Sequence, residues 1–356
     1  FKQKTAYEIM PSLVGSEMCI RDRPDTPSVK IGEEVVEKVA LGGAVKGWKR
    51  EELVRAAKVL LRRRRREILR LAGLRLDEAT RRIIARWHNR WQKARLAVLH
   101  KVFVEKQPAS KQELAAVRHA YNCLCIAFSR RLKTLLSMRR EDALKRLSEL
   151  RRIRKRYDVA AKALKLLGKD VGCEEDVVLA EAALLLVSGS ERLKELWCRL
   201  RGWRLQMLVE VMADRIEKAN KAVTWLSREE RLLVELINRT RRMMGRLPLV
   251  VDGRLCRAAR AHAREMRRLG YFGHISPTAG RATPLDRARM ERFHGKVGEN
   301  IFKGGGPEEA LLAWLTSDDH SRNMLGGWNP LVAADDESAR ITGPVSYTHL
   351  TLPTKA

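Results

Sequence analysis

Apolar residues recur every three or four positions through much of the chain. In residues 141–167 they fall, for example, at Leu147 and Leu150, and residues 190–226 continue with the same spacing. This period places apolar side chains on one face of an α-helix. Clusters of glycine, proline and serine interrupt it, which predicts five or six helices in residues 24–227.

These helices are expected to pack antiparallel, as a bundle or a long hairpin, because each one must bury an apolar stripe. The heptads are too irregular to predict one continuous coiled coil. The longest apolar run, residues 177–187, is interrupted by Glu181 and is shorter than the roughly 18 residues that a membrane-spanning helix needs. The sequence therefore predicts no membrane span.

Residues 228–343 change to a mixed pattern that predicts an α+β domain. Alternation between glycines indicates a strand, whereas Thr283 followed by Pro284 is typical of a helix start. Gly270 is typical of a helix end. The expected elements are helices at residues 229–245 and 253–269, helices that start at Pro284 and Pro307, and a strand at residues 297–302.

Both ends of the chain lack these patterns. Residues 1–23 and 344–356 resemble translated sequencing-adaptor read-through, and the first residue is Phe1. We therefore expect that neither tail packs into a domain, with a pair of genuine irregular tails as the alternative. Any signal peptide would have preceded residue 24.

The chain of 356 residues has a net charge of +29, and residues 1–245 carry +25 of it. Arginines are dense at residues 62–66 and again at residues 151–156. One interpretation is weak, salt-sensitive binding of anionic polymers, either cell-wall polymers or nucleic acid, with Trp87 and Trp91 stacking on bases. The other is a solvated basic helix face on which these two tryptophans pack together. No base-reading motif favours the first interpretation.

Cysteines and most histidines show no spacing typical of a site. The six cysteines form neither CxxC pairs nor zinc-type Cys/His patterns, and they are too sparse for a disulfide framework. His88, His100 and His119 have no second ligand at helical spacing, so they are expected in surface or core roles.

Four short motifs in residues 228–343 carry a family resemblance. They are Ile237-Asn238-Arg239-Thr240-Arg241, His274 in H-x-S-P, Glu299 in G-E-N-I, and His320 in S-x-x-H-x-x-N-x-L. Together they resemble the bacterial form of the CAP superfamily, also called the SCP domain. The resemblance implies an α-β-α sandwich with a small antiparallel sheet between helices, truncated here near residue 343. It also implies an exported protein of the cell envelope or the extracellular space.

The resemblance further implies a cleft lined by His274, Glu299 and His320. Ser317 stands where many relatives have a second glutamate, which weakens a catalytic role. Three uses of the cleft stay open: binding of an unknown ligand, metal-dependent hydrolysis with Zn²⁺ held by the three residues, and proton transfer without metal. His262 and His294 match no motif position and are expected at the surface.

Overall fold

A computed structural model of the chain shows two compact units. Unit 1 comprises Phe1–Leu76 and Thr134–Leu200, and unit 2 comprises Asp77–Lys133 and Arg201–Ala356. We expected a boundary near residue 227, whereas residues 77–133 and 201–227 share a compact unit with the predicted α+β domain. The structure describes residues 27–325 and 347–351, apart from Lys106, Pro108, Cys173, Glu191, Cys198 and Lys296. The first tail, residues 1–23, lies outside them.

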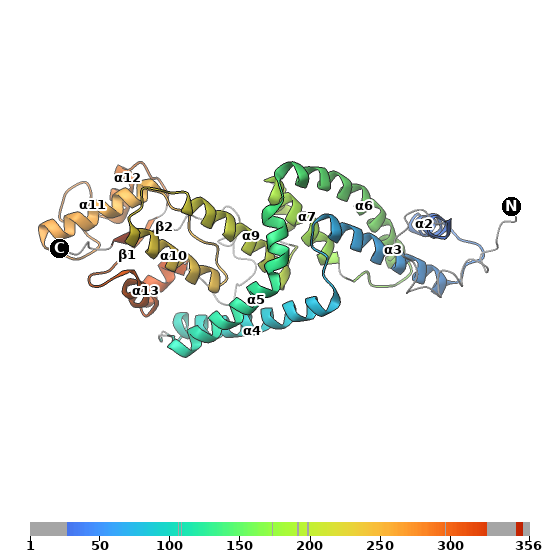
Figure 1. Ribbon diagram of the computed structural model, residues 1–356, viewed down its shortest axis with the longest axis horizontal. Helices are drawn as coiled ribbons and strands as arrows, with labels where there is room; N and C mark the ends of the chain where they lie inside the picture. Colours follow the sequence, from blue (N-terminus) through green and yellow to red (C-terminus); the bar gives the residue numbers. More distant parts are fainter. Residues whose placement is uncertain are drawn as a thin grey trace. The chain divides into compact units, whose positions relative to one another are not determined.

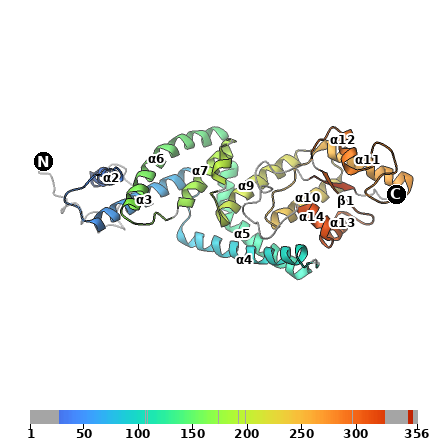
Figure 2. The same ribbon diagram turned by 180° about the vertical axis from the view of Figure 1, so that it is seen from behind.

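Unit 1 is helical and is built around α7. Its helices are α2 (Pro27–Ala40), α3 (Arg50–Leu71), α6 (Arg140–Leu166), α7 (Glu174–Ser188) and α8 (Leu193–Trp197). Residues Val177 to Val187 of α7 are buried except Glu181, so this apolar run forms a core helix. Helices α3 and α6 pack against α7 and against each other, as Figures 1 and 2 show.

The described part of residues 27–227 holds eight helices, more than the five or six expected. One extra helix, α2, lies in the stretch rich in proline and glycine and begins at Pro27. Another arises because residues 190–226 divide into α8 and α9 at Gly202, whose φ is +55°. None of the helices in residues 27–325 is long and apolar enough to cross a bilayer.

The arginine run of α3 is partly structural. Arg64 is 7% exposed and forms ion pairs with Glu33 and Glu67, and Arg63 also pairs with Glu67. Arg62 and Arg66 are exposed. Only part of the dense positive charge on this helix is therefore available to bind anionic polymers.

Unit 2 combines a helical part with a mixed part. Its elements are α4 (Glu78–Phe103), most of α5 (Lys111–Ser137), α9 (Gly202–Lys221), α10 (Arg228–Met243), α11 (Gly253–Leu269), α12 (Pro284–Met290), β1 (Val297–Ile301), α13 (Pro307–Leu315), α14 (Asp318–Leu325) and β2 (Tyr347–Thr351). The predicted starts and ends recur here. Thr283 caps α12 in a capping box, and α11 ends at Gly270 with φ +70°.

Strand β1 pairs in parallel with β2, from Val297 opposite Tyr347 to Ile301 opposite Thr351. The α-β-α sandwich with a small antiparallel sheet, which the resemblance implies, stays a prediction. Residues 347–351 belong to the second tail, and they pair with β1 along its length. The physical reason is that β1 alone has unpaired backbone groups, and a short segment rich in aromatic and β-branched residues can pair with such an edge.

Helix α4 holds the loop that follows α10. Trp91 is 0% exposed, and its Nε1 donates to the Met243 carbonyl at 2.8 Å. Arg95, also buried, donates through Nη1 to the Met244 carbonyl at 3.0 Å. Trp91 is thus a core residue, so of the two interpretations only packing fits this side chain.

Helix α9 is bonded to the segment after α10 in the same way. The Asn220 side chain donates to the Leu249 carbonyl at 2.8 Å and accepts from Val251 N at 3.0 Å. Asn238 of α10 also donates to the Leu249 carbonyl and accepts from Leu249 N. These bonds between side chain and backbone fix residues 249–251 against both helices, so the helical and mixed parts of unit 2 form one packed body.

Candidate functional site

Glu299 lies at the centre of the candidate site, on β1. Nη2 of Arg287, from α12, donates to both of its carboxylate oxygens, at 2.9 and 3.0 Å. Both side chains are 2% exposed. A buried ion pair is stable only when each group is neutralised and hydrogen-bonded, and this pair meets that condition.

His274 joins the pair from the loop between α11 and α12. Its Nδ1 donates to Glu299 Oε1 at 2.9 Å, and its side chain is 45% exposed. Arg287 also donates to the His274 carbonyl at 3.0 Å and so fixes the loop backbone. The resulting geometry presents one edge of an oriented imidazole to solvent.

His320 lies on α14 and contacts a different group. Its Nδ1 shares a hydrogen bond of 2.7 Å with Ser317 Oγ, and its carbonyl accepts from Asn300 of β1 at 3.0 Å. Partial burial lowers the pKa of His320, and the nearby His274 charge lowers it further. The two histidines are therefore electrostatic neighbours, although Glu299 bonds only His274 of the two.

His262 is the residue that sequence reasoning missed. We expected it at the surface, but it is 0% exposed on α11, and its Nε2 donates to the Gly273 carbonyl at 3.1 Å. The same nitrogen lies 3.8 Å from Glu299 Oε1. Burial lowers the pKa of His262, so the imidazole is neutral at neutral pH. His294 is exposed, as expected.

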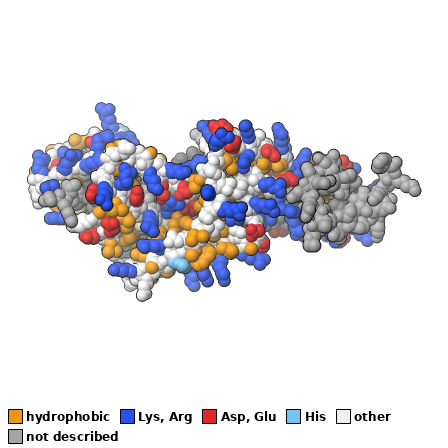
Figure 3. Space-filling view, viewed as in Figure 1, with side chains coloured by type: hydrophobic (Ala, Val, Ile, Leu, Met, Phe, Trp, Pro, Cys, Tyr) orange, Lys and Arg blue, Asp and Glu red, His pale blue; other side chains and the backbone are white. Residues whose placement is uncertain are grey.

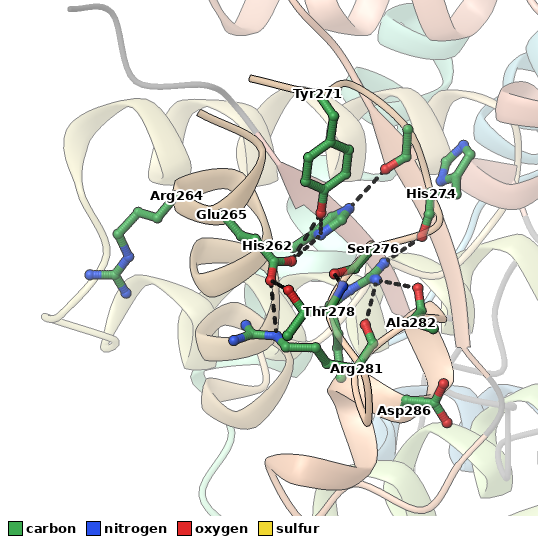
Figure 4. A network of polar contacts seen from close by, with 12 residues as sticks. His262, Arg264, Glu265, Tyr271, His274, Ser276, Thr278, Arg281, Ala282 and Asp286 are labelled. Atoms are coloured by element: carbon green, nitrogen blue, oxygen red, sulfur yellow. Dashed lines mark hydrogen bonds and ion pairs between the residues drawn. The ribbon is translucent and has the colours of Figure 1, made fainter. Parts of the chain in front are cut away.

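Figure 4 shows the polar network behind the histidines, which is centred on Glu265 of α11. Glu265 Oε2 accepts from the Tyr271 hydroxyl at 2.9 Å, and Oε1 accepts from the Thr278 hydroxyl at 2.7 Å. Burial alone would raise the pKa of this carboxyl, but hydrogen bonds from Thr278, Ser276 and Tyr271 lower it to about 2. The network fixes the loop that carries His274.

A Zn²⁺ site held by His274, Glu299 and His320 stays a prediction from the sequence. Within residues 27–325 and 347–351, no three His, Cys, Asp or Glu side chains are arranged to hold a metal ion. The reason is local: Arg287 occupies both oxygens of Glu299, and Ser317 occupies Nδ1 of His320. The cysteines whose thiols are described, Cys123, Cys125 and Cys256, are free.

Comparison with known proteins finds a family match in the mixed part of unit 2. Residues 234–328 match the model of CAP, the cysteine-rich secretory protein family. The chain is also 37% identical over 115 residues to the uncharacterized protein YkwD of Bacillus subtilis (strain 168). That match covers 32% of this chain and 44% of the relative, so the chain spans less than half of the relative's length. No solved structure matches the chain significantly.

Proposed function

Because the chain contains a CAP domain at residues 234–328, we propose that it is an exported binding module of the cell envelope or the extracellular space. The ligand contacts the solvent-facing edge of His274, with His320 beside it. Glu299 and His262 act as positioning residues, because neither side chain is exposed.

The observation that carries the proposal is the bonding of Glu299. Its charge is compensated by Arg287, and one of its oxygens also accepts the proton of His274 Nδ1. A carboxylate bonded in this way holds an imidazole in one orientation and fixes its tautomer. It is poorly suited to take up a further proton or a metal ion. Recognition of a polar ligand therefore fits the arrangement better than hydrolysis does.

The test is co-sedimentation of the full chain with purified peptidoglycan sacculi. We expect the variants His274→Ala and His320→Ala to bind about tenfold more weakly, the equivalent of about 1.4 kcal/mol. His294→Ala is the matched control because this histidine is exposed and lies outside the bonded group. Equal binding by wild type and both site variants would refute the proposal for this surface.

The same preparations distinguish binding from the hydrolase alternative. Elemental analysis of the full chain measures bound zinc, and release of soluble fragments from the sacculi measures cleavage. The binding module is expected to release none. One zinc per chain, together with cleavage that is lost in His274→Ala, would instead establish a metal-dependent hydrolase.

A second candidate function, polyanion binding by unit 1, is supported by four residues of α6. Arg151, Arg152, Lys155 and Arg156 are exposed, and none forms an ion pair with any described residue. Arg151 and Lys155 are four residues apart, as are Arg152 and Arg156, so the four side chains lie on one helix face. Figure 3 shows Lys and Arg side chains spread over the visible surface. We propose that this α6 stripe binds phosphate-bearing or other anionic polymers without sequence preference.

DNA binding measured over a range of salt concentrations tests this stripe. Arg152→Gln/Arg156→Gln should lower affinity and reduce the slope of log affinity against log salt by about two, because each phosphate contact contributes about 0.9. Arg55→Gln/Lys58→Gln is the control, since these exposed residues of α3 lie outside the stripe. A wild-type affinity that is independent of salt would contradict the candidate.

A further inference from the structure

A cavity of about 440 Å³ lies in unit 2, between α5, α9 and α10. Much of its lining, including Tyr121, Cys125 and Lys221, comes from outside residues 234–328. Its size is within the range of small-molecule sites, roughly 300–1,000 Å³. The cavity is thus separate from the His274 site and depends on helices that the family match does not cover.

The inner wall of the cavity is preformed and mainly apolar in character. Tyr121 and Leu226 are buried, each 9% exposed. The Tyr121 hydroxyl donates to the two oxygens of Glu210 at 2.9 and 2.8 Å, so it has no donor left for a ligand. Asn238 is equally committed to the Leu249 backbone. Such a wall offers aromatic and aliphatic surface held in place by hydrogen bonds.

Two exposed cations at the mouth have no carboxylate partner in the described part of the chain. Arg242, by contrast, pairs with three carboxylates, those of Glu210, Asp214 and Glu217. Three other lining cations, Lys221, Arg231 and Arg239, form no ion pair within the described part of the chain, and Glu235 is the one further lining carboxylate. Lys221 and Arg239 are also exposed. Each of these two cations can therefore bond an anionic group directly, because neither is already bonded to a carboxylate among the described residues.

We propose that this cavity binds a small amphipathic anion, with an apolar body against Tyr121 and Leu226 and a carboxylate, sulfonate or phosphate group between Lys221 and Arg239. The apolar wall supplies affinity through burial, and the two cations orient the ligand. This proposal is independent of the function assigned to His274.

Titration of the full chain with the dye anilinonaphthalene sulfonate, an aromatic sulfonate, tests the site by fluorescence. Lys221→Glu/Arg239→Glu should weaken binding about tenfold or more, and Val234→Trp should abolish it by filling the cavity. Lys218→Glu/Arg228→Glu is the matched control, because these exposed residues lie on the same two helices outside the lining. It should stay within about twofold of wild type.

A second measurement locates the dye. Cys125 lines the cavity and Cys256 does not, and both thiols are free. Bound dye should slow N-ethylmaleimide modification of Cys125, followed by mass spectrometry, and leave that of Cys256 unchanged. Circular dichroism establishes that each variant is folded. Equal dye affinity in wild type, the charge-reversal variant and a folded Val234→Trp, or equal protection of both thiols, would overturn the proposal.

Discussion

Arg287 holds both carboxylate oxygens of Glu299 in a pair that is almost closed to solvent. The same guanidinium bonds the carbonyls of Ala282 and His274, so it joins α12, β1 and the His274 loop. The orientation of the exposed His274 imidazole therefore depends on a buried arginine that lies outside the four motifs of the family resemblance.

Replacing Arg287 alone should be strongly destabilising. Arg287→Met leaves the Glu299 charge buried without its partner, a change that typically costs about 3–5 kcal/mol. The double variant Arg287→Met/Glu299→Leu removes both charges and should recover much of that loss. Urea unfolding of the three proteins measures the free energies. A single variant as stable as wild type would show that the pair contributes little.

The Glu265 network predicts an acid-sensitive component of stability. The carboxyl has a pKa of about 2 in the folded chain against a usual value of 4.5. Its contribution is therefore complete above about pH 4.5 and is lost as the pH falls towards 2. Wild type should lose stability more steeply over this range than Glu265→Gln, by on the order of 3 kcal/mol. Parallel curves of unfolding free energy against pH would contradict this expectation.

Local signals predicted the elements of the CAP domain well. Gly253–Leu269 matches the expected helix, and β1 begins at the expected Val297. These features depend on helix caps, glycine positions and residue alternation, all of which operate within a few residues.

The features that local patterns could not decide depend on distant contacts. His262 lies in a helix rich in arginine and looks like a surface residue, yet the loop at Gly273 covers it. Trp91 is buried because its indole meets the Met243 carbonyl, 152 residues later. Nothing in the local pattern of α4 distinguishes a base-stacking tryptophan from one that anchors another helix, and the same contact explains why residues 77–133 belong to unit 2.

Burial of His88 predicts a second pH effect, near neutrality. Burial lowers the pKa of this imidazole to about 4 from its usual 6.5. A histidine whose pKa is lowered by folding stabilises the fold at pH values above its pKa in the unfolded chain. This stability is lost as the pH falls from about 6.5 towards 4. Over this range the free energy of unfolding of unit 2 should fall by on the order of 3 kcal/mol because of this group. It should fall less in His88→Gln. Histidine titration by nuclear magnetic resonance measures the pKa directly, and a value near 6.5 would refute the explanation.

Gly245 follows α10 where α4 packs against it, and its replacement should reveal how tightly the two are joined. Its φ is +73°, and a Cβ there would collide with Nη1 of Arg95, which donates to the Met244 carbonyl. Gly270 has a similar φ of +70° but no atom within 4 Å of its Cβ position. Gly270→Ala should cost about 1 kcal/mol from backbone strain alone.

Gly245→Ala should cost that amount and about 1–3 kcal/mol more, because Arg95 must move and leave a buried carbonyl unpaired. Thermal and urea unfolding of both variants compares the two costs. Arg95→Leu in the Gly245→Ala background removes the obstructing guanidinium, so the two substitutions should be less than additive. Equal destabilisation by the two alanines, or strict additivity in the double variant, would show that the Arg95 contact with the loop does not hold α4 against α10.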